Sequence, residues 1–226
     1  MQKRLTGWAC SLVFFVTLGC AVQVRGDQEI ALAEPAIQGE ISVEQAIRQR
    51  RSVREFGPDT LALTEISQLA WAAQGVTDPA QGYRAAPSAG ATYPIEIDFL
   101  ITGSDVVEDG IYRYQVENHA LVRRMTGDRR REVYAVALEQ NAILQAPVLM
   151  LVSGRLARTE ARYGERAPRF MYMEAGHVAQ NVSLQATALG IDLVVIGAFR
   201  DAELGRVLQL ETGEQPLYIL PLGKSR

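Results

Sequence analysis

The chain has 226 residues, of which 48% are hydrophobic and 22% are charged, and its formal net charge is −3. This is the composition of an ordinary globular protein, and the length suits one domain with a sizeable core. The mild acidity and the lack of long basic runs argue against a nucleic-acid-binding protein, which needs a surface that follows phosphates.

The first 26 residues differ in kind from the rest. Lys3 and Arg4 precede an uncharged run that extends to Val24, the pattern of an export signal. The segment predicts a protein that leaves the cytoplasm for the periplasm or the cell envelope. Cleavage after Gly26 and cleavage before Cys20, at an imperfect lipoprotein box, both remain open. A lipidated Cys20 or an uncleaved segment would attach the protein to a membrane.

The cysteines and histidines limit the chemistry of the mature protein. Both cysteines, Cys10 and Cys20, lie inside the predicted signal. We therefore expect no disulfide, no thiol nucleophile and no cysteine-ligated metal after it. His119 and His177 are far apart, and no other ligand stands at metal-binding spacing from either, so no metal site is predicted.

Residues 27–41 are polar and contain Pro and Gly, which predicts a linker, and the folded domain is expected over residues 42–226. Ser42 with Gln45 three residues later forms a capping-box pattern that begins a helix. Gly75 is a natural terminator of the next helix. The elements expected in this half are helices over 42–51 and 64–74, a half-buried strand over 95–101, and a hairpin of 111–115 with 120–125.

The second half of the domain mixes strands and helices without regular alternation. Residues 147–152 are continuously apolar and predict a central strand. The other expected elements are helices over 128–140, 170–189 and 202–210, and strands over 193–196 and 217–222. Together these patterns predict the α+β class, with a mixed or antiparallel central sheet flanked by helices.

The helix expected over residues 170–189 is the longest in the chain. It is rich in Ala and Gly, and it is apolar on nearly all sides. A helix of this kind must be buried on most of its faces. The covering material is either a partner subunit or the rest of the same chain, and periodicity does not distinguish the two.

Three segments carry candidate chemistry. Arg50, Arg51, Ser52 and Arg54 concentrate donors within one turn, because the arginine fork binds phosphate oxygens in pairs; the alternative is a solvated helix end. Small residues let a flat ligand approach the loop formed by Pro87, Ser88, Ala89 and Gly90, which is otherwise a surface turn. The pair Ile196 and Gly197 ends an apolar strand with a bare N–H for a ligand; the alternative is an ordinary strand-to-turn junction.

These segments, in this order, resemble the nitroreductase family, and within it the dehydrogenases that oxidise azolines in modified peptides. The resemblance spans Ser42 to the C-terminus. Its motifs are Arg50-Arg51-Ser52-Val53-Arg54, Pro87-Ser88-Ala89-Gly90-Ala91-Thr92-Tyr93-Pro94, Arg162-Tyr163-Gly164-Glu165-Arg166, Glu174-Ala175-Gly176-His177-Val178-Ala179-Gln180-Asn181, Ala188-Leu189-Gly190, Ile196-Gly197-Ala198-Phe199 and Leu220-Pro221-Leu222-Gly223-Lys224.

The resemblance implies an obligate homodimer with an FMN at each subunit interface and the long helix in the dimer core. Arg50, Ser52 and Arg54, with Lys224 or Arg226 from the tail, would hold the phosphate and ribityl chain. Arg51 or Arg54 would lie near the pyrimidine end of the ring. The loop of Pro87, Ser88, Ala89 and Gly90 would come from the partner subunit, and Ile196 and Gly197 would lie against the reactive edge.

The implied activity is that of an FMN-dependent, NAD(P)H-linked oxidoreductase that acts on a small nitro, quinone or similar compound. Azoline oxidation is an alternative, but the Lys-Tyr pair of those relatives corresponds here to Arg162-Tyr163, and arginine cannot act as a base near neutral pH. Tyr163 is a candidate proton donor, or else an aromatic residue that covers the pocket. His177 is interpreted as structural. An exported flavin- or ligand-binding protein without turnover is the other alternative.

Overall fold

The computed structural model describes residues 29–225. The predicted signal over residues 1–26, with Cys20, and Arg226 at the C-terminus lie outside the described residues. Within the described residues, no helix combines the length and the apolar character needed to cross a membrane.

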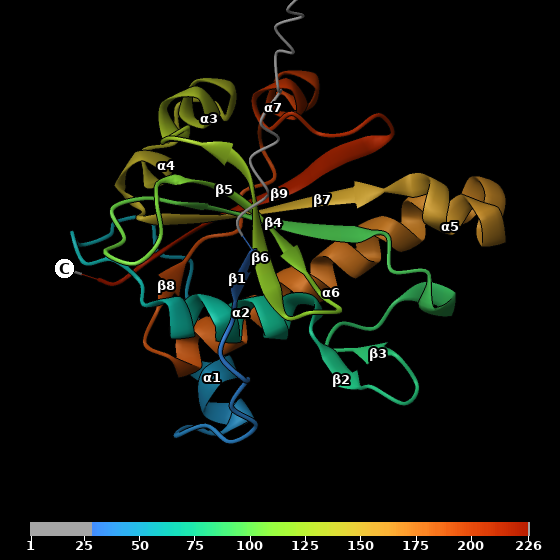
Figure 1. Cartoon of the computed structure of the whole chain (residues 1–226), viewed down its shortest axis with the longest axis horizontal. Helices are drawn as coiled ribbons and strands as arrows, with labels where there is room; N and C mark the ends of the chain where they lie inside the picture. Colours follow the sequence, from blue (N-terminus) through green and yellow to red (C-terminus); the bar gives the residue numbers. More distant parts are fainter. Residues whose placement is uncertain (1–28, 226) are drawn as a thin grey trace, which may run out of the picture.

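A seven-stranded sheet forms the centre of the molecule, and all its paired strands are antiparallel (Figure 1). Its order across the sheet is β1 (Glu29–Ala31), β6 (Ala120–Thr126), β5 (Gly110–Gln115), β4 (Ile95–Ile101), β7 (Val148–Arg155), β9 (Glu214–Gly223) and β8 (Asp192–Leu193). The predicted hairpin is therefore present as β5 and β6, and the apolar run predicted as a central strand is β7, between β4 and β9.

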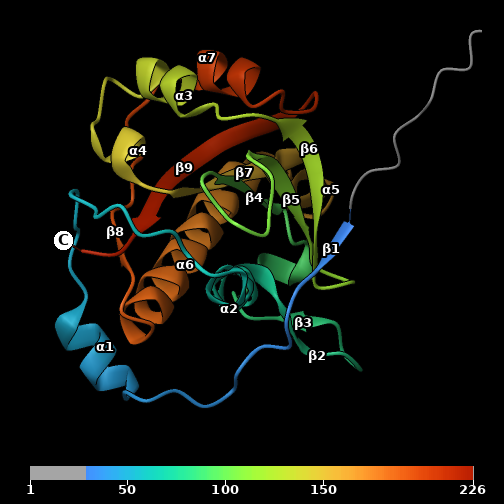
Figure 2. The same ribbon diagram turned by 60° about the vertical axis from the view of Figure 1, so that its left-hand side comes forward.

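Helices cover both faces of this sheet (Figure 2). One face packs against α2 (Leu63–Gln74) and α6 (Ala167–Ala188), and the other against α3 (Arg130–Val136), α4 (Ala142–Gln145) and α7 (Asp201–Val207). The remaining elements are α1 (Val43–Gln49), a small hairpin of β2 (Val76–Asp78) and β3 (Tyr83–Arg84), a 3₁₀ turn Ala89–Ala91, α5 (Leu156–Tyr163) and a 3₁₀ turn Gly164–Arg166. This arrangement confirms the predicted α+β class.

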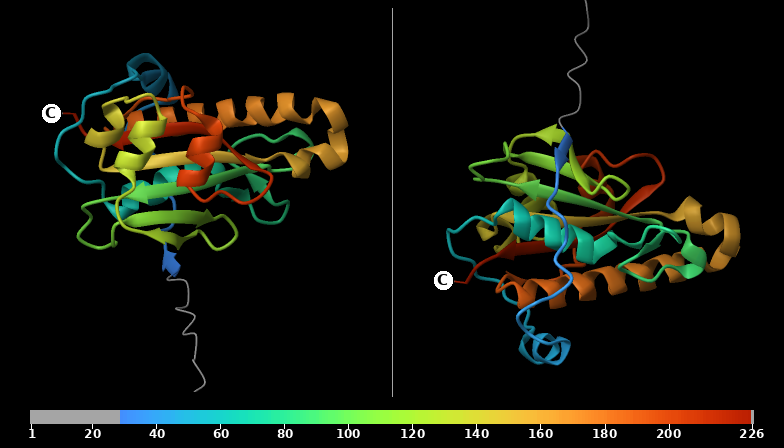
Figure 3. Two further views of the ribbon diagram at one scale, coloured as in Figure 1. Left: turned by 90° about the horizontal axis from the view of Figure 1, so that it is seen from above. Right: turned by 60° about the horizontal axis from the view of Figure 1, so that its bottom comes forward.

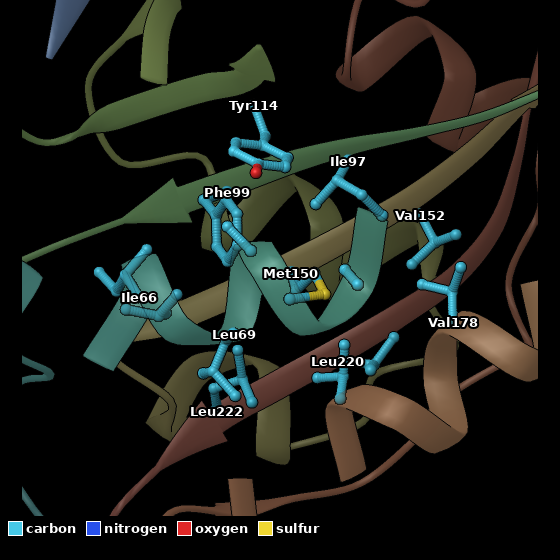
Figure 4. Packing of buried hydrophobic residues seen from close by; sticks show 14 of the residues in the cluster. Ile66, Leu69, Ile97, Phe99, Tyr114, Met150, Val152, Val178, Leu220 and Leu222 are labelled. Atoms are coloured by element: carbon cyan, nitrogen blue, oxygen red, sulfur yellow. The ribbon is translucent and has the colours of Figure 1, made fainter. Parts of the chain in front are cut away.

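Alternation along β4 builds the larger core. Ile95, Ile97, Phe99 and Ile101 all point to the face under α2 and α6, and each is at most 2% exposed. Figure 4 shows Ile97 and Phe99 packed among side chains from β7, β9 and the two helices. Burial of such residues supplies most of the free energy that holds the layers together.

The prediction of a half-buried β4 was wrong, because its other face is covered as well. Asp98 on that face is 1% exposed, and Arg113 of β5 donates two hydrogen bonds of 2.7 Å to its two carboxylate oxygens. Arg113 also pairs with Glu214 at 2.7 Å, and Arg124 pairs with Asp98 at 2.9 Å. Burial alone would lower the pKa of Arg113, but these carboxylates raise it above its ordinary value.

The described part of the predicted linker belongs to the folded domain instead. Glu29–Ala31 pairs with β6 as the edge strand β1. His119, in the hairpin turn, contacts the Ala33 carbonyl at 2.8 Å, and the Gln68 side chain accepts a hydrogen bond from the Ala36 N–H at 2.8 Å. The polar composition of this segment predicted a linker, because composition does not reveal long-range hydrogen bonds.

Several predicted boundaries change for local reasons. The capping box at Ser42 and Gln45 is present and begins α1 as expected. The helix predicted over 128–140 is shorter, because Leu138 and Glu139 have φ of 55° and end it. The strand predicted over 193–196 is broken: β8 ends at Leu193, and Ile196 pairs separately with Ile219.

The long helix α6 begins at Ala167, three residues earlier than predicted, with Pro168 in its first turn. Its buried side includes Ala175, Val178 and Val182. Its other side is open in the single chain, where Tyr172 is 53% and Met173 46% exposed. Figure 3 shows α6 along the outside of the molecule with α1 beside its C-terminal part.

Candidate functional site

The arginine segment, which we define as residues 50–57, leaves the end of α1 and runs beside β8. The Val53 N–H donates to the Leu193 carbonyl at 2.9 Å, and the Gly57 N–H donates to the Lys224 carbonyl at 2.7 Å. The fold thus brings the predicted donors of this segment to the C-terminal tail and to the strand that precedes Ile196. Motifs that are distant in sequence meet here.

The arginines of this segment differ in their availability. Arg51 donates to the carbonyls of Arg48 and Arg50, at 2.9 and 2.8 Å, and so closes the end of α1. Among the described residues, none forms an ion pair with Arg50 or Arg54. Lys224 is paired with Glu65 at 3.0 Å. Arg50 and Arg54 are therefore the donors most free to receive an anion.

A cavity of about 340 Å³ opens beside this segment. Arg54 and Ile196, both predicted site residues, line it together with Gln140, Asn141 and Gln145. Gln140 donates hydrogen bonds of 3.0 Å to the carbonyls of Ala137 and Ala198. None of these amides was a predicted site residue, and Gln140 was placed at the end of the helix predicted over residues 128–140.

Ile196, the residue before Gly197, is held by both of its backbone groups. The N–H and the carbonyl of Ile196 both pair with Ile219, each at 2.9 Å. Gly197, the next residue, is exposed and lies just beyond this isolated bridge. Its role as a backbone donor to a ligand stays a prediction.

The serine loop, which we define as residues 87–91, lies at the other end of the molecule and is fastened by α5. Arg162 donates to the Gly90 carbonyl at 3.1 Å, and Arg158 donates to the Tyr93 carbonyl at 2.8 Å. Ala91 and Tyr93 both have positive φ, of 53° and 43°. The hydrogen bonds from α5 hold the loop in place, and the positive φ angles show that its backbone is strained.

Tyr163 lies directly against this loop. A Cβ atom at Gly90 would stand 2.7 Å from the Tyr163 hydroxyl, and Gly90 has φ of 58°, so both space and conformation require glycine there. The Tyr163 ring also packs on Phe170, with 4.7 Å between the ring centroids. The structure therefore places the predicted catalytic tyrosine beside the predicted cofactor-binding loop.

A buried carboxylic acid under the loop was absent from the sequence-based site. Glu174 on α6 is 2% exposed, accepts a hydrogen bond from the Gln74 amide at 3.4 Å, and is influenced by the Ser88 hydroxyl. Burial raises its pKa, which these hydrogen bonds and the charges of Arg84 and His177 only partly oppose. The residue lies in the motif that contains His177, but a lone glutamate in a helix gave no signal of its burial.

The neighbouring polar residues of α6 act on the same loop. His177 is exposed and lies outside the core, and its Nδ1 lies 3.3 Å from the Pro87 carbonyl. Asn181 donates to the carbonyls of Ala72 and Ala85, at 3.2 and 3.1 Å. It ties α2 to the segment just before the serine loop.

The two halves of the predicted site are far apart within one chain. The serine loop contacts Tyr163, before the start of α6, whereas the arginine segment contacts Leu193, beyond its end. The loop also contacts His177, in the middle of this 22-residue helix, so the C-terminal half of α6, roughly 17 Å long, separates it from the arginine segment. The two halves therefore lie at different places on one chain.

The fold and the ordered motifs are those of one family: residues 47–224 match the model of the nitroreductase family, and the chain belongs to that family. It is 42% identical over 185 residues to "Putative nitroreductase MJ1384" of Methanocaldococcus jannaschii, covering 82% of this chain and 92% of that protein. A crystal structure from Ralstonia eutropha JMP134, described as "a putative nitroreductase", superposes with a TM-score of 0.78 at 26% identity, covering 88% of this chain and 90% of the other.

More distant similarity extends to peptide-processing systems. The chain is 28% identical over 167 residues to the trifolitoxin-processing protein TfxB of Rhizobium leguminosarum bv. trifolii, covering 68% of this chain and 44% of that protein. It shares its fold with the E. coli microcin synthetase complex McbBCD, at a TM-score of 0.66 and 20% identity, covering 96% of this chain and 85% of the other. These matches agree with the branch that the sequence motifs resemble.

Over residues 29–225, no group of three or more His, Cys, Asp and Glu side chains is placed to hold a metal ion.

Proposed function

We propose that this protein is an FMN-dependent oxidoreductase that transfers two electrons between a nicotinamide donor and a small organic substrate such as a nitro or quinone compound. The observation that carries the proposal is the pair of half-sites at opposite ends of α6. One half offers guanidinium groups and an exposed strand-end N–H, and the other offers a rigid loop of small residues. Each half lacks what the other supplies.

The residues of the arginine segment suit the charged end of FMN. Arg50 and Arg54 have no ion-pair partner among the described residues, and Ser52 is exposed between them. Charge-assisted hydrogen bonds from arginine to phosphate are among the strongest in proteins. Lys224 would join them by exchanging its partner Glu65 for the phosphate. Arg226 is the other proposed contact from the tail.

The remaining residues would orient the ring and limit access to it. Bound FMN supplies the two-electron redox chemistry, so the protein needs no acid–base dyad of its own. The Gly197 N–H would donate to the reactive edge of the flavin ring. The cavity beside Arg54 and Ile196 would receive part of the substrate. Tyr163 would shield the site from water and would deliver a proton to the substrate.

A homodimer completes the site in this proposal. A twofold axis across α6 would reverse the direction of the partner helix and bring each serine loop to the partner's arginine segment. The open side of α6, with Tyr172 and Met173, and the exposed Val43 and Ile47 of α1 provide apolar surface for such an interface.

Flavin uptake tests the proposed function directly. Purified mature protein incubated with FMN and then desalted should retain the visible absorption of the flavin and should melt at a higher temperature than the untreated sample. NADH or NADPH should then bleach the bound flavin, and a quinone should restore its colour. A sample that stays colourless and shows no thermal shift would refute the proposal.

The dimer is tested by placing a charge on the open side of α6. Met173→Asp should convert the dimer to monomers, because two unpaired carboxylates would be buried across the twofold axis. The same variant should lose flavin retention, since each site takes residues from both subunits. Sedimentation velocity and desalting with FMN measure the two effects. Val106→Asp is the control, because Val106 is 73% exposed and belongs to the loop after β4; equal behaviour of the two variants would contradict the dimer.

A further inference from the structure

Glu174 and Gln74 form a buried polar pair beneath the serine loop. Glu174 is 2% exposed, Gln74 is fully buried at 0%, and the Gln74 amide donates to the Glu174 carboxyl at 3.4 Å. The Gln74 Oε1 atom is also buried and has no donor among the described residues. A buried acceptor without a donor is costly, and a neutral Glu174 would carry the O–H that Gln74 lacks.

Ser88 connects this pair to the surface of the loop. Its hydroxyl oxygen accepts a hydrogen bond from the Tyr93 N–H at 2.9 Å, and the same hydroxyl acts on the Glu174 carboxyl and lowers its pKa. A serine hydroxyl has a single hydrogen. While Ser88 donates that hydrogen to an ionised Glu174, it cannot donate to a ligand on the exposed side of the loop.

The surroundings of Glu174 allow both protonation states. α2 presents the uncharged Gln74, the loop presents Ser88, and the charged or titratable groups that act on Glu174 are Arg84 from β3 and His177 from α6. Burial is the largest influence and favours the neutral acid, while the hydrogen bonds and the two basic groups favour the carboxylate. The net effect raises the pKa of Glu174 above the ordinary value of a glutamate.

We propose that Glu174 is a positioning residue whose protonation decides whether the Ser88 hydroxyl donates to the flavin. In the ionised state, Ser88 donates to Glu174 and offers the flavin no hydrogen. In the neutral state, the Glu174 O–H donates to Gln74 or to the Ser88 oxygen, and the Ser88 hydrogen turns to the exposed side. This inference rests on the proposed function, in which the serine loop faces the flavin of the partner's site.

A pH titration of the visible absorption and circular dichroism of the bound FMN tests the inference. Wild type should show a one-proton spectral transition above the usual pH range of a glutamate. Glu174→Gln should lose the transition and keep the low-pH spectrum of wild type at every pH, because its amide donates to Ser88 as the neutral acid does. Ser88→Ala should also lose the transition. Glu160→Gln, at an exposed position on α5, should titrate like wild type.

Two outcomes separate this inference from the proposed function. A transition that persists unchanged in Glu174→Gln overturns the role of Glu174 while flavin binding stands. Failure of wild type to take up FMN overturns the proposed function instead. In that case the coupling between Glu174 and Ser88 is tested in the flavin-free protein. Protection of the Tyr93 amide against hydrogen exchange should change with pH in wild type and in Glu160→Gln but not in Glu174→Gln, and equal profiles in all three overturn it.

Stability provides a readout that does not depend on flavin. Because the folded chain holds the Glu174 proton more tightly than the unfolded chain, this proton contributes stability that is complete below the unfolded pKa and is lost as the pH rises through the folded pKa. The free energy of unfolding of wild type relative to Glu174→Gln should therefore fall as the pH rises. A difference that is constant with pH contradicts a raised pKa.

Discussion

Replacing Arg50 and Arg54 together with alanine should weaken FMN binding by about 100-fold or more. A hydrogen bond to a charged group contributes about 1.5–3 kcal/mol, so two guanidiniums account for roughly 3–6 kcal/mol, or about two to four powers of ten in the dissociation constant. Neither side chain has an ion-pair partner among the described residues, so the fold should not depend on them. Flavin fluorescence titration measures the loss, and thermal melting of the flavin-free protein checks the fold.

Arg48→Ala is the matched control for this experiment. Arg48 belongs to the last turn of α1, two residues before Arg50, and its side chain is exposed. The control removes one positive charge from the same region, so it measures the general electrostatic contribution, which salt screens. If Arg48→Ala weakens FMN binding as much as the double variant does, the specific phosphate contact at Arg50 and Arg54 is wrong.

Replacing Arg113 with methionine should destabilise the fold by about 3–5 kcal/mol, the usual cost of removing one partner of a buried ion pair. The substitution leaves Asp98, at 1% exposure, and Glu214, with a side chain at 0% exposure, without their principal cation. Methionine preserves much of the volume, so lost packing contributes little. Urea denaturation at neutral pH measures the change in the free energy of unfolding.

The cost of this substitution should also depend on pH. Burial alone would raise the pKa of Glu214, but its hydrogen bond from Ser153 and the charge of Arg113 together lower it. Its ionisation therefore contributes stability that is present above the unfolded pKa and is lost as the pH falls through the folded pKa. The difference between wild type and Arg113→Met should shrink in acid.

Arg123→Met provides the comparison for Arg113. Arg123 pairs with Glu108, whose side chain is 74% exposed, and an exposed pair of this kind contributes at most about 1 kcal/mol. The two arginines lie on adjacent strands, β5 and β6, so the chemistry is matched and the burial differs. If the two variants lose similar stability, the buried network is not the stabilising element that its geometry indicates.

The sequence alone determined the features that depend on short-range patterns. The capping box at Ser42, the alternation over residues 95–101 and the small-sided helix near residues 170–189 each follow from local periodicity, and they give the α+β class. The order of the Arg50, Ser88, Glu174 and Gly197 motifs was sufficient to indicate the family. These are properties of neighbouring residues, so no folded structure is needed to identify them.

Only the tertiary structure decided what depends on distant neighbours. Asp98 had the spacing of an exposed residue. In the folded chain, Arg113 and Arg124 from neighbouring strands pair with it and cover it. Residues after Glu29 had the composition of a linker, yet hydrogen bonds to β6 and α2 fix them. The linear sequence likewise does not show how far the serine loop and the arginine segment are separated along α6. Ion pairs and sheet edges join residues through space, and their cost or gain appears only when the chain has folded.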